Sequence, residues 1–229
     1  MFVKSIPLRS RALLLLPMLW TQSAQAHGIA GNRYFAGTMT FDDPAVADEL
    51  ILPNFNYLGY PAQGSDAVEN RINASFARLL TPTLAFTIDS AWVHQTWPTG
   101  RTSGFDKTSI GLKYEAYRDN RHEALISIGL AWGIGHSGSV AIGADAPDTI
   151  QPGIFFGKGF GDLPDQLSWL RPFAVTGAFI GELPTSTSGR ALAPTATGGF
   201  ATVFSPAVET LHWGFSVQYS TLYLTNRFD

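Results

Sequence analysis

The chain has 229 residues, with 15 Lys and Arg against 18 Asp and Glu, and charged residues make up 14% of it where ordinary soluble domains have roughly 25%. The acidic balance excludes a nucleic-acid partner, since such a partner requires a basic patch. The absence of cysteine excludes disulfide bonds as a source of stability.

The first 26 residues predict a cleaved secretory signal peptide. Basic residues (Lys4, Arg9 and Arg11) precede a short apolar run at 12–20, and the small residues Ala24 and Ala26 follow it. The apolar run is about half of the ~20 residues that a membrane-spanning helix needs, so a retained anchor is the weaker alternative. Removing residues 1–26 takes away three basic residues and no acidic ones, which lowers the net charge from −3 to −6.

Cleavage after Ala26 would leave His27 as the first residue of the mature chain. An α-amine and an imidazole on one residue can together chelate Cu(II), because imidazole is a suitable copper ligand. His27 is therefore the metal-ligand candidate of this sequence. The alternative is a chance residue after the cleavage site, since nothing in the sequence brings a second histidine beside it. We expect no cofactor.

Residues 27–69 form a leading segment without a sustained hydrophobic period. It is rich in proline, glycine and acidic residues, and we expect a plug, one or two N-terminal strands, or a periplasmic flap. Four carboxylates lie close together in it: Asp42, Asp43, Asp48 and Glu49. Such oxygens can bind Ca²⁺, but the spacing of a calcium loop is absent, and Asp43-Pro44 equally predicts a turn.

From residue 70 to residue 229, large apolar residues alternate with small, polar or charged ones, which is the period of a β-strand. The clearest run places Leu211, Trp213, Phe215, Val217 and Tyr219 against His212, Gly214, Ser216, Gln218 and Ser220. Similar runs lie at 71–76, 84–92, 110–115, 124–134 and 173–179, with weaker ones near 151–160 and 197–205. The connection at 81–83 is short, whereas those at 94–106 and 135–149 are long.

This pattern favours an all-β fold, an antiparallel transmembrane β-barrel, over a soluble sandwich or a lipocalin-like cup. After Trp20 no apolar run is long enough for a spanning helix, and a closed barrel is the other fold that satisfies a backbone in lipid. Several runs approach the length of a tilted membrane strand, and aromatic residues gather near their ends. We expect about 8–12 strands in the complete barrel.

The end of the chain bears on closure of the barrel. The residues from Thr225 to Asp229 are mostly polar, with Phe228 next to last. Barrels of this type usually finish with an aromatic residue that the outer-membrane assembly machinery reads. Either the run at 211–224 closes the barrel or the chain is truncated before its last strands, and we expect the second, because the final run reads as an internal strand.

Polar and charged residues on the second face are expected to line the lumen, because a charge that faces lipid costs up to a few kcal/mol. The expected lumen-lining residues are Arg71, Asp89, Lys113, Glu115, His212 and Gln218. They either line a polar path or pair with one another to fill a small barrel.

The segment Gly135-His136-Ser137-Gly138-Ser139 brings a histidine and serines together in sequence. Adjacent residues of a strand point to opposite faces, and no G-x-S-x-G motif is present. We therefore expect a long loop here, no catalytic residues and no enzymatic activity.

Four motifs carry a resemblance to a known group: A-H-G-I-A-G at 26–31, R-Y-F at 33–35, F-D-D-P at 41–44 and W-G-F-S-V-Q-Y-S at 213–220. They resemble uncharacterised proteobacterial outer-membrane β-barrel proteins labelled as transporters, similar to phenol-degradation-associated barrels. The resemblance covers most of the mature chain and implies an outer-membrane location and, more weakly, transport. Members of that group typically continue past the point where this chain stops.

The expected function is that of a passive channel or transporter in the bacterial outer membrane. Its solute is a small molecule, hydrophobic if the likeness to channels for hydrophobic compounds holds. Its partners are membrane lipid, that solute and the outer-membrane assembly machinery. The alternatives are a non-transporting structural or surface barrel and, behind it, a copper-binding or lipolytic enzyme.

Overall fold

The computed structural model describes residues 28–37, 42–62, 65–98, 100–195 and 199–220. Nearly all of the regular structure in this part is β-strand, interrupted by the 3-10 helices η1 (Val140–Ile142) and η2 (Asp165–Leu170). None of the helices in the described ranges is both long and apolar enough to span a lipid bilayer. The prediction of an all-β antiparallel fold is confirmed.

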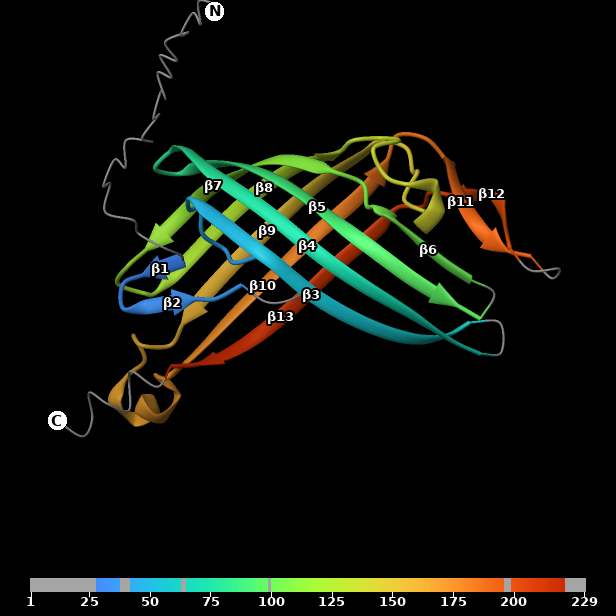
Figure 1. Ribbon diagram of the computed structural model, residues 1–229. Coiled ribbons are helices and arrows are strands. Elements are labelled where there is room, and N and C mark those ends of the chain that lie inside the picture. The colour runs from blue at the N-terminus through green and yellow to red at the C-terminus, as the bar shows by residue number, and fades with distance from the viewer. Residues whose placement is uncertain (1–27, 38–41, 63–64, 99, 196–198, 221–229) are drawn as a thin grey trace, which may run out of the picture.

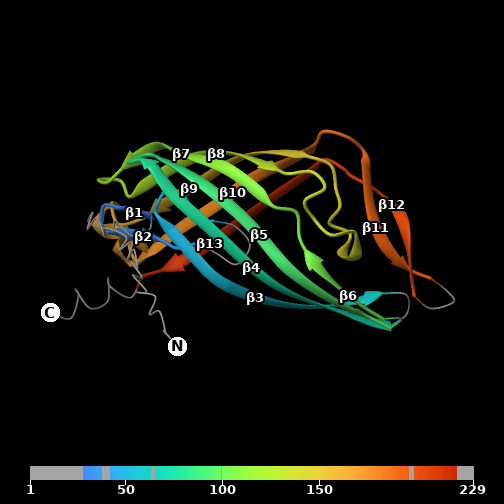
Figure 2. The same cartoon turned by 45° about the horizontal axis from the view of Figure 1, so that its top comes forward.

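The main element is a nine-stranded antiparallel sheet. Its strands are β3 (Glu49–Ala62), β4 (Ser65–Thr81), β5 (Leu84–Trp97), β6 (Gly100–Phe105), β7 (Ser109–Asp119), β8 (Ala124–Gly133), β9 (Thr149–Gly159), β10 (Phe173–Pro184) and β13 (Thr210–Tyr219). They lie in the order β3-β4-β5-β7-β8-β9-β10-β13, and β6 pairs with the second half of β5. Figures 1 and 2 show the sheet curling, so that β3 to β5 cross in front of β9, β10 and β13.

The curled sheet is a half-barrel whose two edges are β3 and β13. Within the described part of the chain each of these strands has one partner, β4 for β3 and β10 for β13. The edge strand β3 contains Pro53 and Pro61, and edges are where a strand tolerates a residue that cannot donate to the ladder.

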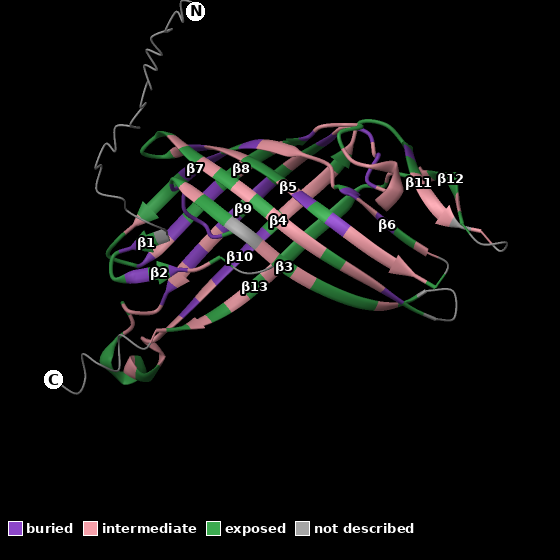
Figure 3. Cartoon of the chain, viewed as in Figure 1, coloured by how far each residue is buried: buried purple, intermediate pink, exposed green. Residues whose placement is uncertain are grey.

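The two faces of the sheet carry different side chains. On β13 the apolar residues at every second position are between 49% and 71% exposed, although they are large. The residues between them share the concave face with small or polar residues of the neighbouring strands, as the pairing of Ser216 with Thr176 shows. Figure 3 shows this alternation along the strands. The large apolar side chains therefore face away from the hollow of the sheet.

The two ends of the half-barrel differ. At one end the connections are a turn at 82–83, a turn at 120–123 and the segment 160–172 with η2. At the other end lie the loop 134–148 with η1 and the separate hairpin of β11 (Ser188–Pro194) and β12 (Phe200–Pro206), on the right in Figure 1. The predicted contrast between the short connection at 81–83 and the long one at 135–149 is confirmed.

Two sequence expectations about strand positions need correction. The segment 94–106 is not a long loop, because β5 continues to Trp97 and β6 returns from Gly100. Its residues are polar on both faces, as in His94-Gln95-Thr96, so it lacks the apolar alternation although the backbone pairs regularly. The sheet also begins at Glu49, so residue 70, the predicted start of the barrel, falls inside β4.

The buried core lies between the sheet and a short segment inside its hollow. The hairpin of β1 (Gly28–Ala30) and β2 (Arg33–Phe35), together with residues 42–48, is called the inner segment below. Ala30, Phe35 and Ala45 form one buried cluster with Leu125 of β8 and Ala174 of β10. Figures 1 and 2 show β1 and β2 against the end of the sheet that has the short connections. The core is thus made by this segment and one curled sheet, not by two stacked sheets.

Candidate functional site

A cavity of about 750 Å³ lies in the hollow of the sheet, between the inner segment and the concave faces of β3 to β10. We call it the chamber. Most of the side chains that line it are small or uncharged. Its amide and hydroxyl groups come from Asn54, Asn56, Asn73, Gln151, Ser75, Thr87, Ser109 and Tyr34. Apolar side chains, among them Ile51, Phe155 and Ile180, share the lining with these groups, so the chamber combines polar and apolar surface.

Lys113 of β7 joins the wall of the chamber to the inner segment. Its Nζ lies 2.6 Å from Oδ2 of Asp42, donates to the carbonyl oxygen of Asp43 and lies 4.5 Å from the centroid of the Phe155 ring. The residue is only 5% exposed, so its ammonium depends on these contacts for the solvation that water would otherwise give. Lys113 fixes residues 42 and 43 above the sheet.

Asp43 is an acidic residue with a perturbed environment. Its Oδ1 accepts a hydrogen bond from the backbone N–H of Ala45 at 2.7 Å, which is the side-chain turn expected from Asp43-Pro44. Burial raises the pKa of Asp43 to about 6; the ammonium of Lys113 lowers that pKa, and the carboxylate of Asp42 raises it further. Asp43 therefore changes charge close to physiological pH, unlike an ordinary aspartate.

The carboxylates of Asp42, Asp43 and Glu49 lie within 4.8 Å of one another. Oxygen ligands at such spacing suit Ca²⁺, but the ammonium of Lys113 already contacts Asp42. The fourth carboxylate of the predicted group, Asp48, lies apart from these three and binds Nη1 of Arg78 and the N–H of Leu79. Only part of the predicted acidic group is thus brought together.

A second set of contacts fastens the inner segment at the end with the short connections. Arg33 of β2 lies 3.2 Å from the carboxylate of Glu123, and donates to the carbonyl oxygens of Pro172 at 3.0 Å and Arg171 at 2.6 Å. Gln218 of β13 donates to the carbonyl oxygen of Ala36 at 2.9 Å. Arg33 and Ala36 are therefore bound to the connections at 120–123 and 160–172 and to the edge strand β13.

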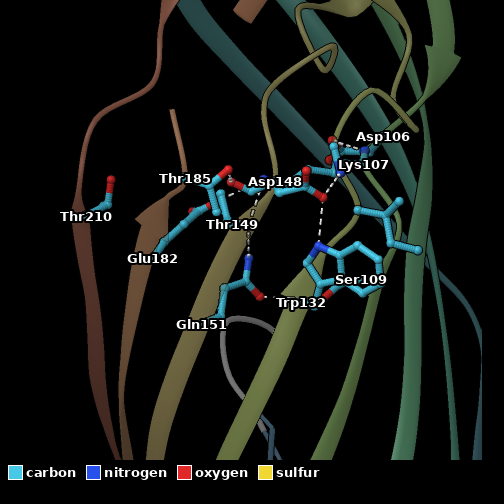
Figure 4. Close-up of polar contacts among 12 residues, drawn as sticks. Asp106, Lys107, Ser109, Trp132, Asp148, Thr149, Gln151, Glu182, Thr185 and Thr210 are labelled. Atoms are coloured by element: carbon cyan, nitrogen blue, oxygen red, sulfur yellow. Dashed lines mark hydrogen bonds and ion pairs between the residues drawn. The ribbon is translucent and has the colours of Figure 1, made fainter. Parts of the chain in front are cut away.

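Charged residues cross the concave face next to the chamber, and Arg71 belongs to both. Arg71 of β4 pairs with Glu69 and Asp106, and Lys107 pairs with Glu182 of β10 at 3.1 Å. Lys107 also donates to the hydroxyl of Thr149, as Figure 4 shows. We call the five charged residues, Glu69, Arg71, Asp106, Lys107 and Glu182, the charged belt. It runs across the sheet from β4 to β10, and His212 of β13 extends it through a contact of 3.4 Å with Glu182.

Hydrogen bonds and ion pairs hold the loop 134–148 against neighbouring strands. The backbone N–H of Ser139 donates to the carbonyl oxygen of Phe105 in β6 at 2.8 Å. Asp145 accepts from Arg190 of β11 and contacts His136, both at 2.6 Å, and the contact with His136, more than that with Arg190, lowers the pKa of Asp145. Asp148 accepts from the indole of Trp132 at 2.7 Å, a contact visible in Figure 4.

The six residues predicted to line the lumen fall into two groups. Arg71, Asp89 and Lys113 line the chamber. The other three lie outside it. Glu115 is buried and paired with Arg118 of its own strand, Gln218 holds the inner segment, and His212 is an exposed residue at the edge of the belt. His27, the predicted metal ligand, lies outside the described residues.

Sequence reasoning missed most of the charged belt. Glu69 lies two positions before Arg71 on β4, so both point to the same face of the sheet, and this spacing could have identified Glu69. Glu182 likewise continues the alternation of β10 beyond the predicted run at 173–179. Asp106 and Lys107 lie in the break between β6 and β7, where no period places them on a face.

The histidine and serines of the loop 134–148 do not form a nucleophile–base pair in the described part of the chain. The imidazole of His136 contacts Asp145, while the hydroxyl of Ser137 donates to the carbonyl oxygen of Ile134 at 2.7 Å. Nucleophilic catalysis needs the hydroxyl and the imidazole within hydrogen-bond reach. These contacts therefore favour a structural role for both residues.

Comparison with known proteins gave no relative. No protein-family model matches the chain, and neither the curated proteins nor the solved structures contain a significant match. The resemblance to outer-membrane barrels stated above stays a prediction.

Proposed function

We propose that this protein forms an outer-membrane β-barrel through which a small polar solute passes, with the inner segment seated in its lumen. The observation that carries the proposal is the contrast between the two faces of the sheet. Phe55, Trp213 and Val217 are 73%, 65% and 71% exposed on the convex face, whereas amides, hydroxyls and charges line the concave face.

Exposure of so much apolar surface is costly in water and favourable in lipid. Each Å² of apolar surface left in water costs about 25 cal/mol relative to burial, and exposed patches of this extent mark a contact with protein or membrane. In the described residues the two smaller sheets, β1–β2 and β11–β12, lie inside the hollow and beyond one end. Neither covers the convex face, which supports lipid as the partner of that face.

The edges of the sheet set a condition for this proposal. Unpaired backbone N–H and C=O groups each cost several kcal/mol in hydrocarbon. We therefore expect β3 and β13 to be joined in the membrane, directly or through further strands. A barrel closed in this way would enclose the chamber and the charged belt.

The lining of the chamber bears on the class of solute. The resemblance stated above suggested a hydrophobic compound, but Asn54, Asn73, Gln151 and their neighbours offer hydrogen-bond donors and acceptors. Such groups replace part of a hydration shell and gain nothing from an apolar solute. These groups favour a solute that can form hydrogen bonds, while the apolar side chains beside them, such as Phe155 and Ile180, can contact its carbon skeleton.

A second candidate is a barrel that transports nothing. The observation in its favour is the fastening of the inner segment by the buried Arg33–Glu123 pair, whose side chains are 2% and 6% exposed. A segment held in this way would block one end of the lumen. The protein would then serve as a structural or surface barrel.

The experiment first determines the cellular compartment of the protein and then measures ion conductance. The protein is expected in the outer-membrane fraction, to require detergent for extraction and to show heat-modifiable mobility on a gel. Reconstituted in a planar bilayer, it is expected to conduct ions in discrete steps. A folded protein that is freely soluble without detergent would refute the membrane assignment, and a detergent-dependent barrel without conductance would favour the second candidate.

A further inference from the structure

The chamber has more acidic than basic groups. The carboxyl groups of Asp42, Asp43, Glu49 and Asp89 line it. The basic residues among its described lining are Lys113 and Arg71. The ammonium of Lys113 already contacts Asp42, and the guanidinium of Arg71 is shared between Glu69 and Asp106. Among the described lining residues, acidic groups therefore outnumber basic ones by four to two.

The charged belt adds to this imbalance. It contributes three carboxylates (Glu69, Asp106 and Glu182) against Arg71 and Lys107. Taken together, the described residues of the chamber and the belt comprise seven acidic and three basic side chains, with Arg71 counted once. A solute that moves along the concave face would therefore meet an excess of negative charge at two successive levels.

The imbalance is specific to this part of the concave face. Where the inner segment is fastened, buried charges are matched one to one, as in Arg33 with Glu123 and Arg118 with Glu115. Those pairs serve packing and leave no net charge. The excess of carboxylates begins where the chamber begins, so it marks the space that a solute would occupy.

We infer that the lumen selects small cations over anions. This inference rests on the proposed function and names the class of solute for the same site. A passage lined by one sign of charge and walled by material of low dielectric constant concentrates ions of the opposite sign, and rings of Asp and Glu give cation selectivity in pores. The volume of about 750 Å³ admits organic cations of several carbon atoms as well as inorganic ones.

The first test measures the reversal potential of the reconstituted protein across a KCl gradient. The wild type is expected to pass K⁺ several-fold better than Cl⁻. The double substitution Glu49→Gln with Asp89→Asn removes two chamber charges and is expected to halve this preference or more. The control is Asp165→Asn, which makes the same change of charge on a residue whose side chain is 93% exposed in η2, outside the chamber.

The second test separates inorganic from organic cations. N-methyl-D-glucamine, D-sorbitol and D-gluconate share a six-carbon polyol chain, are of nearly equal size and carry positive, zero and negative charge. Uptake into proteoliposomes is expected in the order cation, neutral, anion. Conduction of K⁺ with exclusion of N-methyl-D-glucamine would restrict the class to inorganic cations, which still supports cation selection.

The outcomes distinguish this inference from the proposed function. A conducting protein with no preference, or with a preference for Cl⁻, would overturn the inference and leave the passage in place. A detergent-dependent protein that conducts nothing would overturn both. The heat-modifiable mobility of each variant on a gel reports that it has folded, so a loss of selectivity can be read separately from misfolding.

Discussion

The guanidinium of Arg33 and the carboxylate of Glu123, 90 residues apart in the chain, form a buried pair with 3.2 Å between Nε and Oε2. Glu123 adopts a φ of 47°, in the left-handed region that non-glycine residues seldom occupy. The turn thus keeps an unfavourable backbone conformation where its carboxylate meets the inner segment.

Breaking this pair is expected to release the inner segment. Glu123→Gln removes the carboxylate that lies 3.2 Å from the buried guanidinium of Arg33, which costs about 3–5 kcal/mol. Hydrogen exchange of the backbone amides at 28–37 is expected to rise by about 100-fold or more. Asp165→Asn gives the control, because the Asp165 side chain is 93% exposed and lies outside the inner segment, so this substitution should leave that exchange unchanged. Equal exchange in Glu123→Gln and the wild type would show that the pair does not hold the segment.

A methyl group at position 157 is expected to push the inner segment away from the sheet. A Cβ added at Gly157 would lie 2.9 Å from the ring of Phe35, whereas one added at Gly181 would lie 3.5 Å from its nearest neighbour, Pro152. Overpacking of this kind costs typically about 1–3 kcal/mol. Gly157→Ala should therefore weaken the packing of the inner segment against the sheet, and Gly181→Ala should not.

A cysteine reporter measures this effect. The chain contains no cysteine, and Ala30 of β1 is fully buried against Leu125 and Ala174 of the sheet. In an Ala30→Cys background, maleimide labelling is expected to become about tenfold faster with Gly157→Ala. The idea fails if Gly181→Ala accelerates labelling as much.

Seating of the inner segment is expected to weaken as the pH rises from about 4 to about 6. Burial raises the pKa of Asp43 to about 6, so the seated state prefers the protonated carboxyl, whereas the released segment has an aspartate of ordinary pKa. The seated state therefore has its full stability below about pH 4, where the carboxyl is protonated in both states. It loses on the order of 3 kcal/mol as the pH rises to about 6, and the difference is constant above that pH. The groups that face this carboxyl are Lys113 of β7, Asp42, Glu49 of β3 and Tyr34 of β2.

The measurement compares hydrogen exchange at 28–37 between pH 4 and pH 7, after correction for the intrinsic rates. Asp43→Asn keeps an oxygen that can accept from Ala45 but cannot ionise, and is expected to abolish the pH dependence. A pH dependence that persists in Asp43→Asn would assign it to another group.

A charge on the convex face is expected to act differently from one on the concave face. Phe215 and Ser216 are neighbours on β13 that point to opposite sides of the sheet. Phe215→Lys in lipid should cost about 2–4 kcal/mol near the bilayer midplane, while Ser216→Lys faces the lumen and should cost less. Urea titration of both variants folded into lipid vesicles gives the comparison.

The same pair of substitutions distinguishes a convex face that contacts lipid from one that contacts water. Phe215 is 53% exposed, so in water Phe215→Lys would be harmless and would raise solubility. That result would contradict the proposal that lipid covers this face.

The period of two was sufficient to predict which residues share a face. In β13 and β8 the alternation is uninterrupted, so it indicates both the strand and its apolar side. The same parity places Arg71, Asp89 and Lys113 among residues that line one cavity. Local pattern suffices there because the two faces of a strand contact two different environments.

The rest depends on contacts that no local pattern records. Nothing in R-Y-F at 33–35 indicates that Arg33 meets Glu123, Arg171 and Pro172, all more than 85 residues away. Prolines and glycines hide the alternation of Asn54 and Asn56 in β3, which as an edge strand tolerates them. The break that holds Asp106 and Lys107 has no period at all, so its place in the belt follows only from the folded sheet.

The contacts of the inner segment also constrain the order of assembly. The N-terminal hairpin is synthesised first, yet its partners include Glu123, Arg171 and Gln218, and Gln218 lies 182 residues after Ala36. Contacts of such sequence separation form late, because the chain between them must first be organised. The hairpin therefore docks only after the strands of the sheet have formed. Its docking indicates that β13 has paired with β10.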